Sequence, residues 1–318
     1  MQNERLETIC ARLCLLSSLE RAKGDPQPLS RIMVRKMLSA GALCGLVIRE
    51  DAALEDALIA RARALLGRVS VVYESYERYC AQGYQVLLAE DPQWPMRLQA
   101  LDKAMPLYLF AKGNLQLLEK NTIAVAGSRD ISPETKATAE TVGREIARLG
   151  EVLVCGGARG VDTIVQKAAL EAGGSAILVP AIPVHTLLKE PVYQAALDEG
   201  RLLILCETPP DEAFSAGKAL ARNHSIYALG NRALVVAARK EKGGSWAGAC
   251  DCLRGQWSPV YALDADGDDY RGNQALFELG ARQAALCDGK LCFETHGKQA
   301  VFSQMTLLGE ETTDANTD

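Results

Sequence analysis

From Thr122 onward, short runs of almost continuous apolar residues alternate with longer stretches that carry apolar residues at helical spacing. A strand that is apolar on both faces must be covered on both faces, and amphipathic helices between such strands supply the cover. The pattern therefore predicts an α/β fold with a Rossmann-like, doubly wound, mostly parallel sheet over about residues 80–285. The expected strands are TIAVAG, EVLVCGG, AILVPA, RLLILCE, ALVVAAR and PVYAL, and the helices between them include SPETKATAETVGREIARLG and VDTIVQKAALEAGG.

The segments on either side of this domain have different patterns. Residues 1–75 show the apolar spacing of helices and no convincing strand, which predicts a small helical N-terminal domain. After it, YQVLLAED and PLYLFAKGN indicate two short strands. Residues 286–318 are expected to form a short C-terminal extension with room for a hairpin, ending in an acidic tail that we expect to be disordered.

Composition and charge are those of an ordinary globular protein and restrict its partners. The 318 residues are 48% apolar and 24% charged, and the formal net charge of −5 argues against a general binder of polyanions. Four of the acids lie in the last ten residues, which contain no base. The rest of the chain is therefore nearly neutral, which leaves room for a local basic site.

The ten cysteines and three histidines indicate neither a disulfide framework nor a metal site. No CxxC pair occurs, and the cysteines are expected to be small buried side chains in a reducing compartment. The chain opens without a signal peptide, and no apolar run approaches the ~18 residues that a membrane span requires. We therefore expect a cytoplasmic protein with no metal, no cofactor and no membrane contact.

Three glycine-containing loops follow expected strands, at the edge where doubly wound folds bind their ligands. Each loop places backbone N–H groups at or near a helix start, where the helix dipole favours an anion, and each carries a cation that pairs with phosphate. A single loop of this kind is as easily a tight strand-to-helix connection, but three on one edge predict a phosphate site. The candidate residues are Gly127, Ser128 and Arg129 in the first loop, Gly157, Arg159 and Gly160 in the second, and Lys242, Gly244 and Ser245 in the third.

Sequence patterns for nucleotide chemistry and for catalysis are absent. GxGxxG does not occur in the turn after the first strand, and GxxxxGK[ST], GxSxG and HExxH do not occur at all. Asp162 stands at a helix start, where capping free N–H groups is a simpler role than acting as a base. We therefore expect a binding protein and not an enzyme.

The stretch ALARNHSIYALG places Arg222 and Asn223 before an apolar helix and strand. One interpretation is a buried arginine–asparagine network that holds the edge of the sheet. The other is contact with a polyanion that lies across that edge. The residues alone leave both interpretations open.

Taken in order, these motifs resemble the landmarks of the DprA/Smf family over roughly residues 80–285. The preceding AEDPQWPMRLQAL and PLYLFAKGNLQLL resemble that family's lead-in to its Rossmann-like domain. The matching motifs are VAGSRD, GGARGVDTIVQKAALEAGG, CETPP, ARNHSIYALG, KGGSWAGA and GNQALFELGA.

The resemblance implies roles for individual residues. The three loops match the family's phosphate-binding loops, with Gly127, Ser128 and Arg129 in the first. Arg159 and Gly160 match the second, and Lys242, Gly244 and Ser245 match the last. Lys167 stands where the family often has a basic residue, and Arg222 with Asn223 matches its Arg-Asn pair.

The resemblance also implies a function. Proteins of the DprA/Smf family bind single-stranded DNA, protect incoming strands and help to load the recombinase RecA during natural transformation and recombination. They commonly work as homodimers, and holding a strand by its phosphates requires no catalytic residue. This chain departs from the family pattern in having Gln166 for a histidine, His224 for an arginine and Ala237 for an acidic residue. It also has too few residues after 285 for the winged-helix domain of many members.

Three other functions compete with this one. The related lysine-decarboxylase-like fold contains phosphoribohydrolases that cleave nucleotide monophosphates, but the glutamate that usually follows their glycine loop is missing, and Asp251 stands nearby instead. A sensor that binds a nucleotide without cleaving it is a further alternative. Ligand length separates these classes, because a mononucleotide saturates a sensor or hydrolase whereas a strand binder needs several linked phosphates. A purely structural module would leave the three loops unexplained.

Overall fold

The structure is a computed structural model that describes residues 2–49 and 54–294. Its centre is a ten-stranded sheet with the strand order β12-β11-β10-β9-β5-β6-β7-β8-β4-β3. The strands from β11 to β8 in this order run parallel. At the two edges the pairing is antiparallel: β12 pairs with β11, β4 with β8 and β3 with β4. The strands are β3 (Gln85–Leu88), β4 (Tyr108–Gly113), β5 (Thr122–Ala126), β6 (Val152–Cys155), β7 (Ser175–Leu178), β8 (Leu202–Cys206), β9 (Arg232–Val235), β10 (Val260–Leu263), β11 (Arg282–Cys287) and β12 (Lys290–Phe293).

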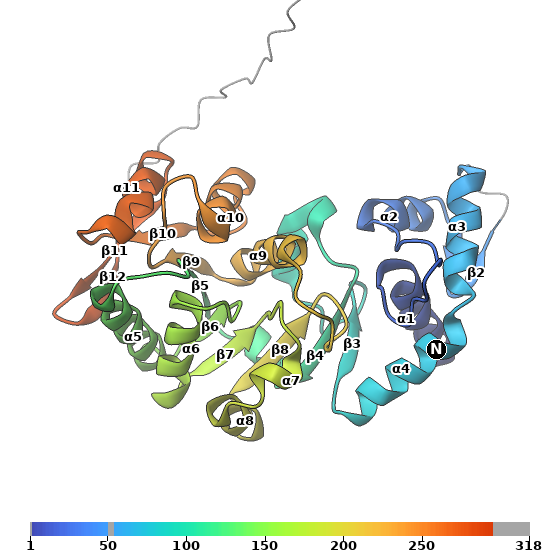
Figure 1. Ribbon diagram of the computed structural model, residues 1–318, viewed down its shortest axis with the longest axis horizontal. Coiled ribbons are helices and arrows are strands. Elements are labelled where there is room, and N and C mark those ends of the chain that lie inside the picture. Colours follow the sequence, from blue (N-terminus) through green and yellow to red (C-terminus); the bar gives the residue numbers. More distant parts are fainter. Residues whose placement is uncertain (1, 50–53, 295–318) are drawn as a thin grey trace, which may run out of the picture.

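Helices cover both faces of this sheet, as the apolar strands require (Figure 1). Alternate strand residues enter two separate apolar clusters: Leu153 of β6 lies in the cluster with α5 and α6, and Val154 lies in the cluster with α9, α10 and α11. The predicted doubly wound α/β fold is confirmed. The helices are α5 (Pro133–Arg148), α6 (Val161–Glu171), α7 (Val184–Leu187) and α8 (Pro191–Asp198) on one face, and α9 (Ala216–Leu229), α10 (Gly243–Gly255) and α11 (Arg271–Glu278) on the other; short 3₁₀ helices are η1 (Met96–Ala104), η2 (Leu115–Glu119) and η3 (Asp268–Tyr270).

The order in which the chain visits the strands creates a switch point between β5 and β9. From β5 the chain proceeds outward through β6, β7 and β8, then returns to β9 on the other side of β5 and proceeds through β10 to β11. Ala126 and Val235, near the carboxyl ends of β5 and β9, are paired in register. The connections therefore diverge at this point, where doubly wound folds bind their ligands.

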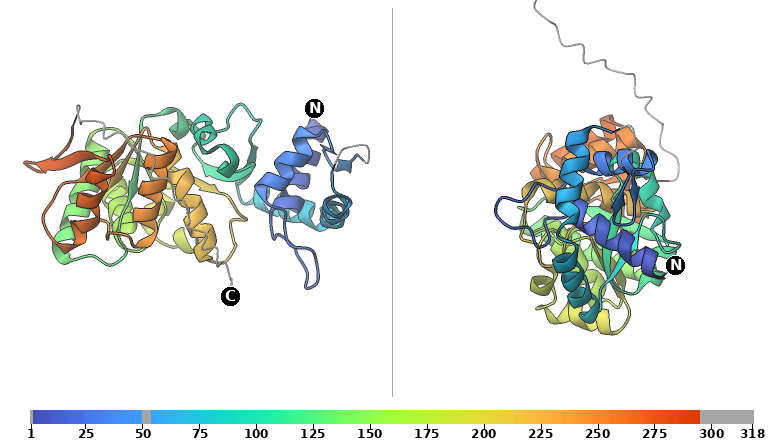
Figure 2. Two further views of the ribbon diagram at one scale, coloured as in Figure 1. Left: turned by 90° about the horizontal axis from the view of Figure 1, so that it is seen from above. Right: turned by 90° about the vertical axis from the view of Figure 1, so that its right-hand side faces the viewer.

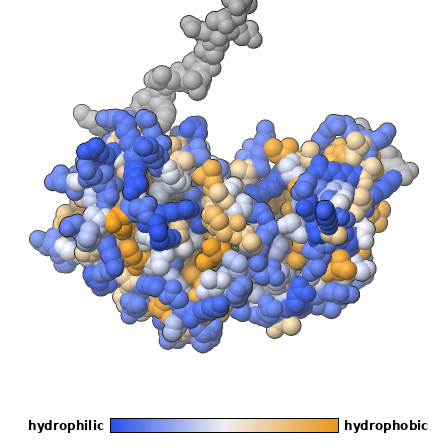
Figure 3. All heavy atoms as spheres, in the orientation of Figure 1, coloured by the Kyte–Doolittle hydropathy of each residue, from blue (hydrophilic) through white to orange (hydrophobic). Residues whose placement is uncertain are grey.

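The N-terminal helices lie beside the β3 edge of the sheet (Figure 2), and a dip in the molecular surface separates them from the part that carries α10 and α11 (Figure 3). Their apolar side chains join the same cluster as α5 and α6, and the ring of Tyr79 lies 5.2 Å from that of Phe110 in β4. The region predicted as purely helical also contains a small hairpin, whose turn at Gly45 has a positive φ of 56°. The elements are α1 (Gln2–Leu16), α2 (Arg31–Ser39), β1 (Leu43–Cys44), β2 (Val47–Ile48), α3 (Asp56–Leu66) and α4 (Val69–Ala81).

The chain boundaries differ in detail from the predicted ones. Helix α4 crosses the boundary predicted at residue 75, and the boundary predicted at residue 285 falls within β11. The expected hairpin is formed by β11 and β12, and β11 also extends the parallel part of the sheet. The acidic tail, for which we predicted disorder, lies outside the described residues. Within the described ranges, no helix has the length and apolar character needed to cross a membrane.

The cysteines are free thiols, and half of them are buried as predicted. Cys44, Cys80, Cys287 and Cys292 are exposed, because they lie in the N-terminal helical part and in the terminal hairpin at the margins of the fold. Among residues 2–49 and 54–294, no three histidine, cysteine or acidic side chains gather in a way that would hold a metal ion.

Candidate functional site

Two linked depressions lie at the carboxyl edge of the sheet, beside the switch point. The first has a volume of about 550 Å³ and is lined by the end of β5 and the loop after it, the loop between β9 and α10, the start of α10 and one face of α9. The second, of about 910 Å³, lies between the loop after β6 and the segment after β8. Arg129, Asp130, Ala158, Ala219 and Arg222 line both, so the two form one continuous groove.

Hydrogen bonds fix the first glycine loop to its neighbours. The N–H of Ser128 donates to the carbonyl of Ala237 at 2.8 Å, and the carbonyl of Ser128 accepts from the N–H of Val161 at 3.2 Å. A Cβ at Gly127 would lie 2.5 Å from methyl groups of Val161, so only glycine lets α6 begin this close to β5. The loop is therefore a rigid wall of the first depression.

The second loop turns sharply and is closed by its own helix. Gly157 and Gly160 have φ values of 71° and 91°, in the region that favours glycine. The buried carboxylate of Asp162 accepts a hydrogen bond from the N–H of Ala158 at 3.4 Å. Because a carboxylate and the Ser128 carbonyl already occupy the start of α6, this helix terminus is less open to an anion than the sequence suggested.

The three helix starts differ in how much of their N–H capacity the chain itself uses. At α5, Asp269 accepts from the N–H of Ser132 at 2.7 Å, and the hydroxyl of Ser132 accepts from the N–H of Thr135 at 3.2 Å. The first turn of α10, by contrast, carries no side-chain cap, and Gly243, Gly244 and Ser245 line the first depression. Of the three helix starts, that of α10 is therefore the one whose first N–H groups no side chain of the described residues caps.

Side chains of α9 hold the third loop in place. The amide of Asn223 donates to the carbonyl of Gly244 at 3.4 Å, and the hydroxyl of Tyr227 donates to the carbonyl of Ser245 at 2.9 Å. The hydroxyl of Ser245 in turn donates to the carbonyl of Gly127 at 2.6 Å, which links the third loop to the first. All of these residues also line the first depression.

Arg222 forms the floor shared by the two depressions. Its side chain is buried, yet its Nε and NH1 atoms have no hydrogen-bond partner among the described residues. It lies against the backbone of Gly156, where a Cβ would overlap the guanidinium group. Burial lowers the pKa of Arg222 and raises that of Asp162, while the attraction between the two charges opposes both shifts. Among the described residues Arg222 therefore forms no hydrogen bond with Asn223, which bonds the Gly244 carbonyl instead. Arg222 lies buried near Asp162 with two donor atoms that have no partner, an arrangement that is costly unless a further group completes it.

The exposed cations of the groove fall into two groups. Arg159 is paired with Asp130, and Lys167 is paired with Glu190 at 2.5 Å and does not line either depression. Arg129, Lys136 and Lys242 line the groove, and their side chains have no hydrogen bond or ion pair within the part of the chain that the structure describes. The unpaired cations are the ones available to a phosphate without the loss of an existing contact.

The three positions that depart from the family pattern have local partners. Gln166 is fully buried and accepts a hydrogen bond from the hydroxyl of Tyr193 at 2.8 Å. His224 faces Asp251 at 3.1 Å, outside both depressions, and Ala237 is buried with its carbonyl bound to the loop N–H described above. None of these three side chains lines the described groove.

Several residues of the site were not found by sequence reasoning. Gly156 was read only as part of a glycine-rich loop, and its role is to admit the guanidinium of α9. Asn273 is fully buried, and its amide donates to three carbonyls at the carboxyl ends of β9 and β10, which fixes the switch point. Lys136 and Phe214 line the second depression and carried no sequence signal, because each lies between the recognisable loops.

Comparison with known proteins relates this geometry to a family. The family model for DNA recombination-mediator protein A matches residues 85–291. The chain is 30% identical over 230 residues to the DNA processing protein DprA of Bacillus subtilis, which covers 70% of this chain and 76% of that protein.

Two solved structures share the fold. The X-ray structure of DprA from Streptococcus pneumoniae aligns with a TM-score of 0.61 at 24% identity, covering 80% of this chain and 90% of that one. The structure of DprA from Helicobacter pylori, which was described for its single-stranded DNA binding mode, aligns with a TM-score of 0.53 at 28% identity, covering 63% and 90%.

Proposed function

Because the chain belongs to the family of DNA recombination-mediator protein A, whose motifs it was found to resemble, we propose that it binds single-stranded DNA along the groove at the carboxyl edge of its sheet. Its relatives are DNA processing proteins, and the Helicobacter pylori relative binds single-stranded DNA. The chain acts as a binding protein and not as an enzyme.

One observation carries this proposal: a continuous groove offers an open helix start together with cations that have no partner in the protein. The first turn of α10, Lys242 and Arg129 border the first depression, and Arg222, two of whose nitrogens are buried without a partner, also lines it. A phosphate there gains backbone N–H donors and positive charge at once. Lys136 continues the unpaired charge along the second depression, beside the ion pair of Arg159 with Asp130, so the groove suits several linked phosphates better than one.

For the biological setting we propose what the resemblance to the DprA/Smf family implies. The bound strand is protected during DNA uptake and recombination, and the protein helps to load a RecA-type recombinase while acting as a homodimer. Sedimentation of the free protein tests the dimer. A recombinase-loading assay on single strands covered by a competing binding protein tests the loading step, and wild-type protein that leaves the loading rate unchanged contradicts it.

The binding proposal is tested by fluorescence anisotropy with labelled dT oligomers of graded length over a salt series. Affinity should rise with length, favour single over double strands and fall steeply with salt, since each neutralised phosphate contributes about 0.7 to the logarithmic salt slope. Arg129→Ala and Lys242→Ala should each weaken binding and reduce that slope. Arg144→Ala is the matched control, because its guanidinium is exposed on α5 and bonds only Thr141 of the same helix.

The outcomes separate the alternatives. Absence of binding at low salt contradicts the proposal. Saturation by a mononucleotide with no gain from added length would favour a nucleotide sensor or hydrolase instead.

A further inference from the structure

The groove offers one exposed aromatic face. Three aromatic side chains line its two depressions in the described part of the chain: Tyr193, Tyr227 and Phe214. The two tyrosines are only 1% and 2% exposed and use their hydroxyl groups within the protein, whereas Phe214 is 52% exposed. Trp246, in the first turn of α10, packs against the apolar cluster under α9 and α10 and does not line the groove.

The exposed ring of Phe214 lies in the groove, beside its cations. A single exposed apolar residue is common on protein surfaces and indicates nothing by itself. Phe214, however, lines the same depression as Arg129, Arg159 and Lys136. An aromatic ring beside a row of cations is the arrangement that holds a single strand, since the cations follow the phosphates and the ring stacks on a base.

Phe214 belongs to the segment 207–215, which connects β8 to α9 and is held by the N-terminal helices. At its start, Glu207 is buried and forms an ion pair with Arg31 of α2. Nearer the phenylalanine, Glu212 accepts hydrogen bonds from Ser18 and Lys218. Two parts of the chain that are distant in sequence, together with the adjacent start of α9, therefore hold the segment that carries Phe214.

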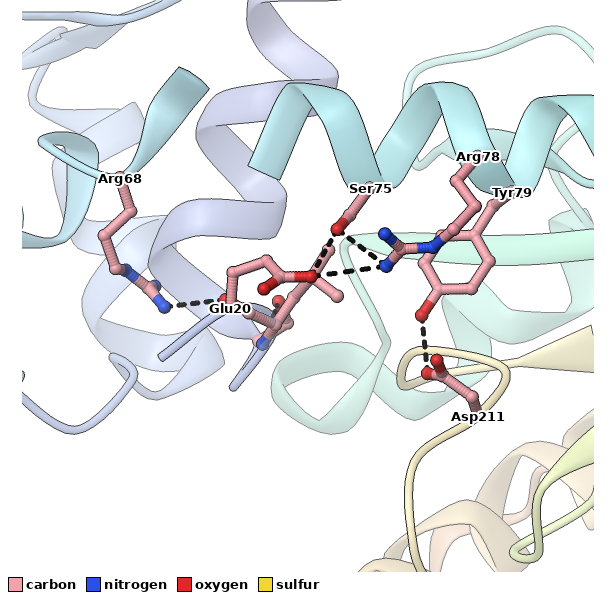
Figure 4. Close-up of polar contacts among 8 residues, drawn as sticks. Glu20, Arg68, Ser75, Arg78, Tyr79 and Asp211 are labelled. Atoms are coloured by element: carbon pink, nitrogen blue, oxygen red, sulfur yellow. Dashed lines mark hydrogen bonds and ion pairs between the residues drawn. The ribbon is translucent and has the colours of Figure 1, made fainter. Parts of the chain in front are cut away.

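A further hydrogen bond holds the segment at Asp211, and it comes from a helix that is itself held in place by polar contacts (Figure 4). The hydroxyl of Tyr79 in α4 donates to Asp211 at 2.5 Å, and the ring of Tyr79 is 2% exposed. Behind it, Arg78 bonds Ser75 at 2.8 Å and Glu20 at 3.2 Å, which ties α4 to the turn after α1. The tyrosine thus reaches the segment from a rigid support.

We propose that Phe214 stacks on a base of the bound strand in the second depression, and that the N-terminal helices position it there through the segment 207–215. This inference rests on the proposed function. In this arrangement a base of the strand contacts Phe214, and the phosphates contact the cations of the loops. It also gives the N-terminal helices a role in binding, although they do not themselves line either depression.

The test compares Phe214→Ala, Phe214→Leu and Phe214→Trp in the full chain, with two dT oligomers of one length. One oligomer is ordinary, and the other carries abasic sites throughout its central part. On the ordinary strand, the alanine and leucine variants should bind about 5- to 100-fold more weakly than the wild type, because a stacked base is lost, while the tryptophan variant should retain affinity. On the abasic strand, all four proteins should bind alike.

Tyr79→Phe tests the positioning part of the inference. It removes the hydrogen bond to Asp211 but keeps the buried ring, so it should weaken binding of the ordinary strand and leave binding of the abasic strand unchanged. Tyr73→Phe is the matched control, because the Tyr73 hydroxyl bonds Glu77 on the exposed side of the same helix at 2.6 Å. Equal loss on both strands would mean that the tyrosine acts only on the fold, and would overturn its positioning role.

The results distinguish this inference from the function on which it rests. If the wild type binds the ordinary strand and Phe214→Leu binds it equally well, stacking is wrong and strand binding stands. If the leucine variant is weakened as much on the abasic strand, the ring does not contact a base and the inference is also wrong. If the wild type binds neither strand, both proposals fall.

Discussion

Two adjacent glycines allow the role of Arg222 to be tested by opposite effects. At Gly156, φ lies outside the positive region, but a Cβ would overlap the guanidinium of Arg222. At Gly157, φ is 71°, yet a Cβ would meet nothing closer than Gln166 at 3.6 Å. Gly156→Ala therefore displaces a ligand-binding group without backbone strain, and Gly157→Ala strains the backbone without touching that group.

The expected magnitudes follow from these contacts. In Gly156→Ala the guanidinium must move by about 2 Å to reach ordinary van der Waals separation, and since it is the far end of a flexible side chain, stability should change by less than about 1 kcal/mol. A hydrogen bond from a charged donor contributes about 1.5–3 kcal/mol, so affinity for a dT oligomer should fall roughly 10- to 150-fold. Gly157→Ala should lose about 1–2 kcal/mol of stability, the cost of a left-handed alanine, and its affinity should fall less than that of Gly156→Ala, because Arg222 stays in place.

The assay combines urea unfolding with anisotropy titration of a labelled dT oligomer at low salt, on both variants and the wild type. Arg222→Leu serves as the reference for complete loss of the guanidinium. The reasoning is refuted if Gly156→Ala binds like the wild type while Arg222→Leu does not, or if the two glycine variants lose stability and affinity in equal proportion.

Two further predictions concern the support of the site. Asn273→Leu should destabilise the protein by about 2–4 kcal/mol in urea unfolding, since three buried carbonyls lose their donor; a change below about 1 kcal/mol would mean that they find other partners. Hydrogen bonds from Ser75 and Arg78 lower the pKa of Glu20, so its ionised form stabilises the fold above the unfolded pKa of about 4.3, and that contribution is lost as pH falls through the folded pKa. Glu20→Gln should therefore be less stable than the wild type at pH 7 and approach it near pH 3, whereas an equal difference at both pH values would contradict the assignment.

Most of the sheet could be predicted from the sequence because its strands are buried on both faces. Strand β6, for example, is buried at every position and reads as a continuous apolar run. Strand β11 was not recognised as part of the parallel sheet, because it lies near an edge and has a mixed burial pattern that no apolar run reveals. The hairpin of β1 and β2 was missed because strands of two residues leave no periodicity to detect.

The site was predictable where a residue's role is local, and not where it depends on distant contacts. The glycine loops could be located because a positive φ at Gly157 and Gly160, and the close approach of Val161 at Gly127, restrict the residue type at the position itself. The orientation of Lys167 toward Glu190 depends on which helix packs beside α6. The hydrogen bond from Tyr79 to Asp211 joins residues 132 positions apart. Nothing in the sequence around either residue indicates that the two are in contact.

The measurement that tests the central claim most directly is hydrogen exchange of the free protein and of its complex with a dT oligomer, read peptide by peptide. Binding along the carboxyl edge predicts slower exchange in residues 127–130, 156–160 and 242–245, and in the segment 207–215. The start of α10 should be protected most, because its first N–H groups are the ones that a phosphate would accept from. Protection confined to the opposite edge of the sheet, at residues 114–121 and 149–151, would contradict the account.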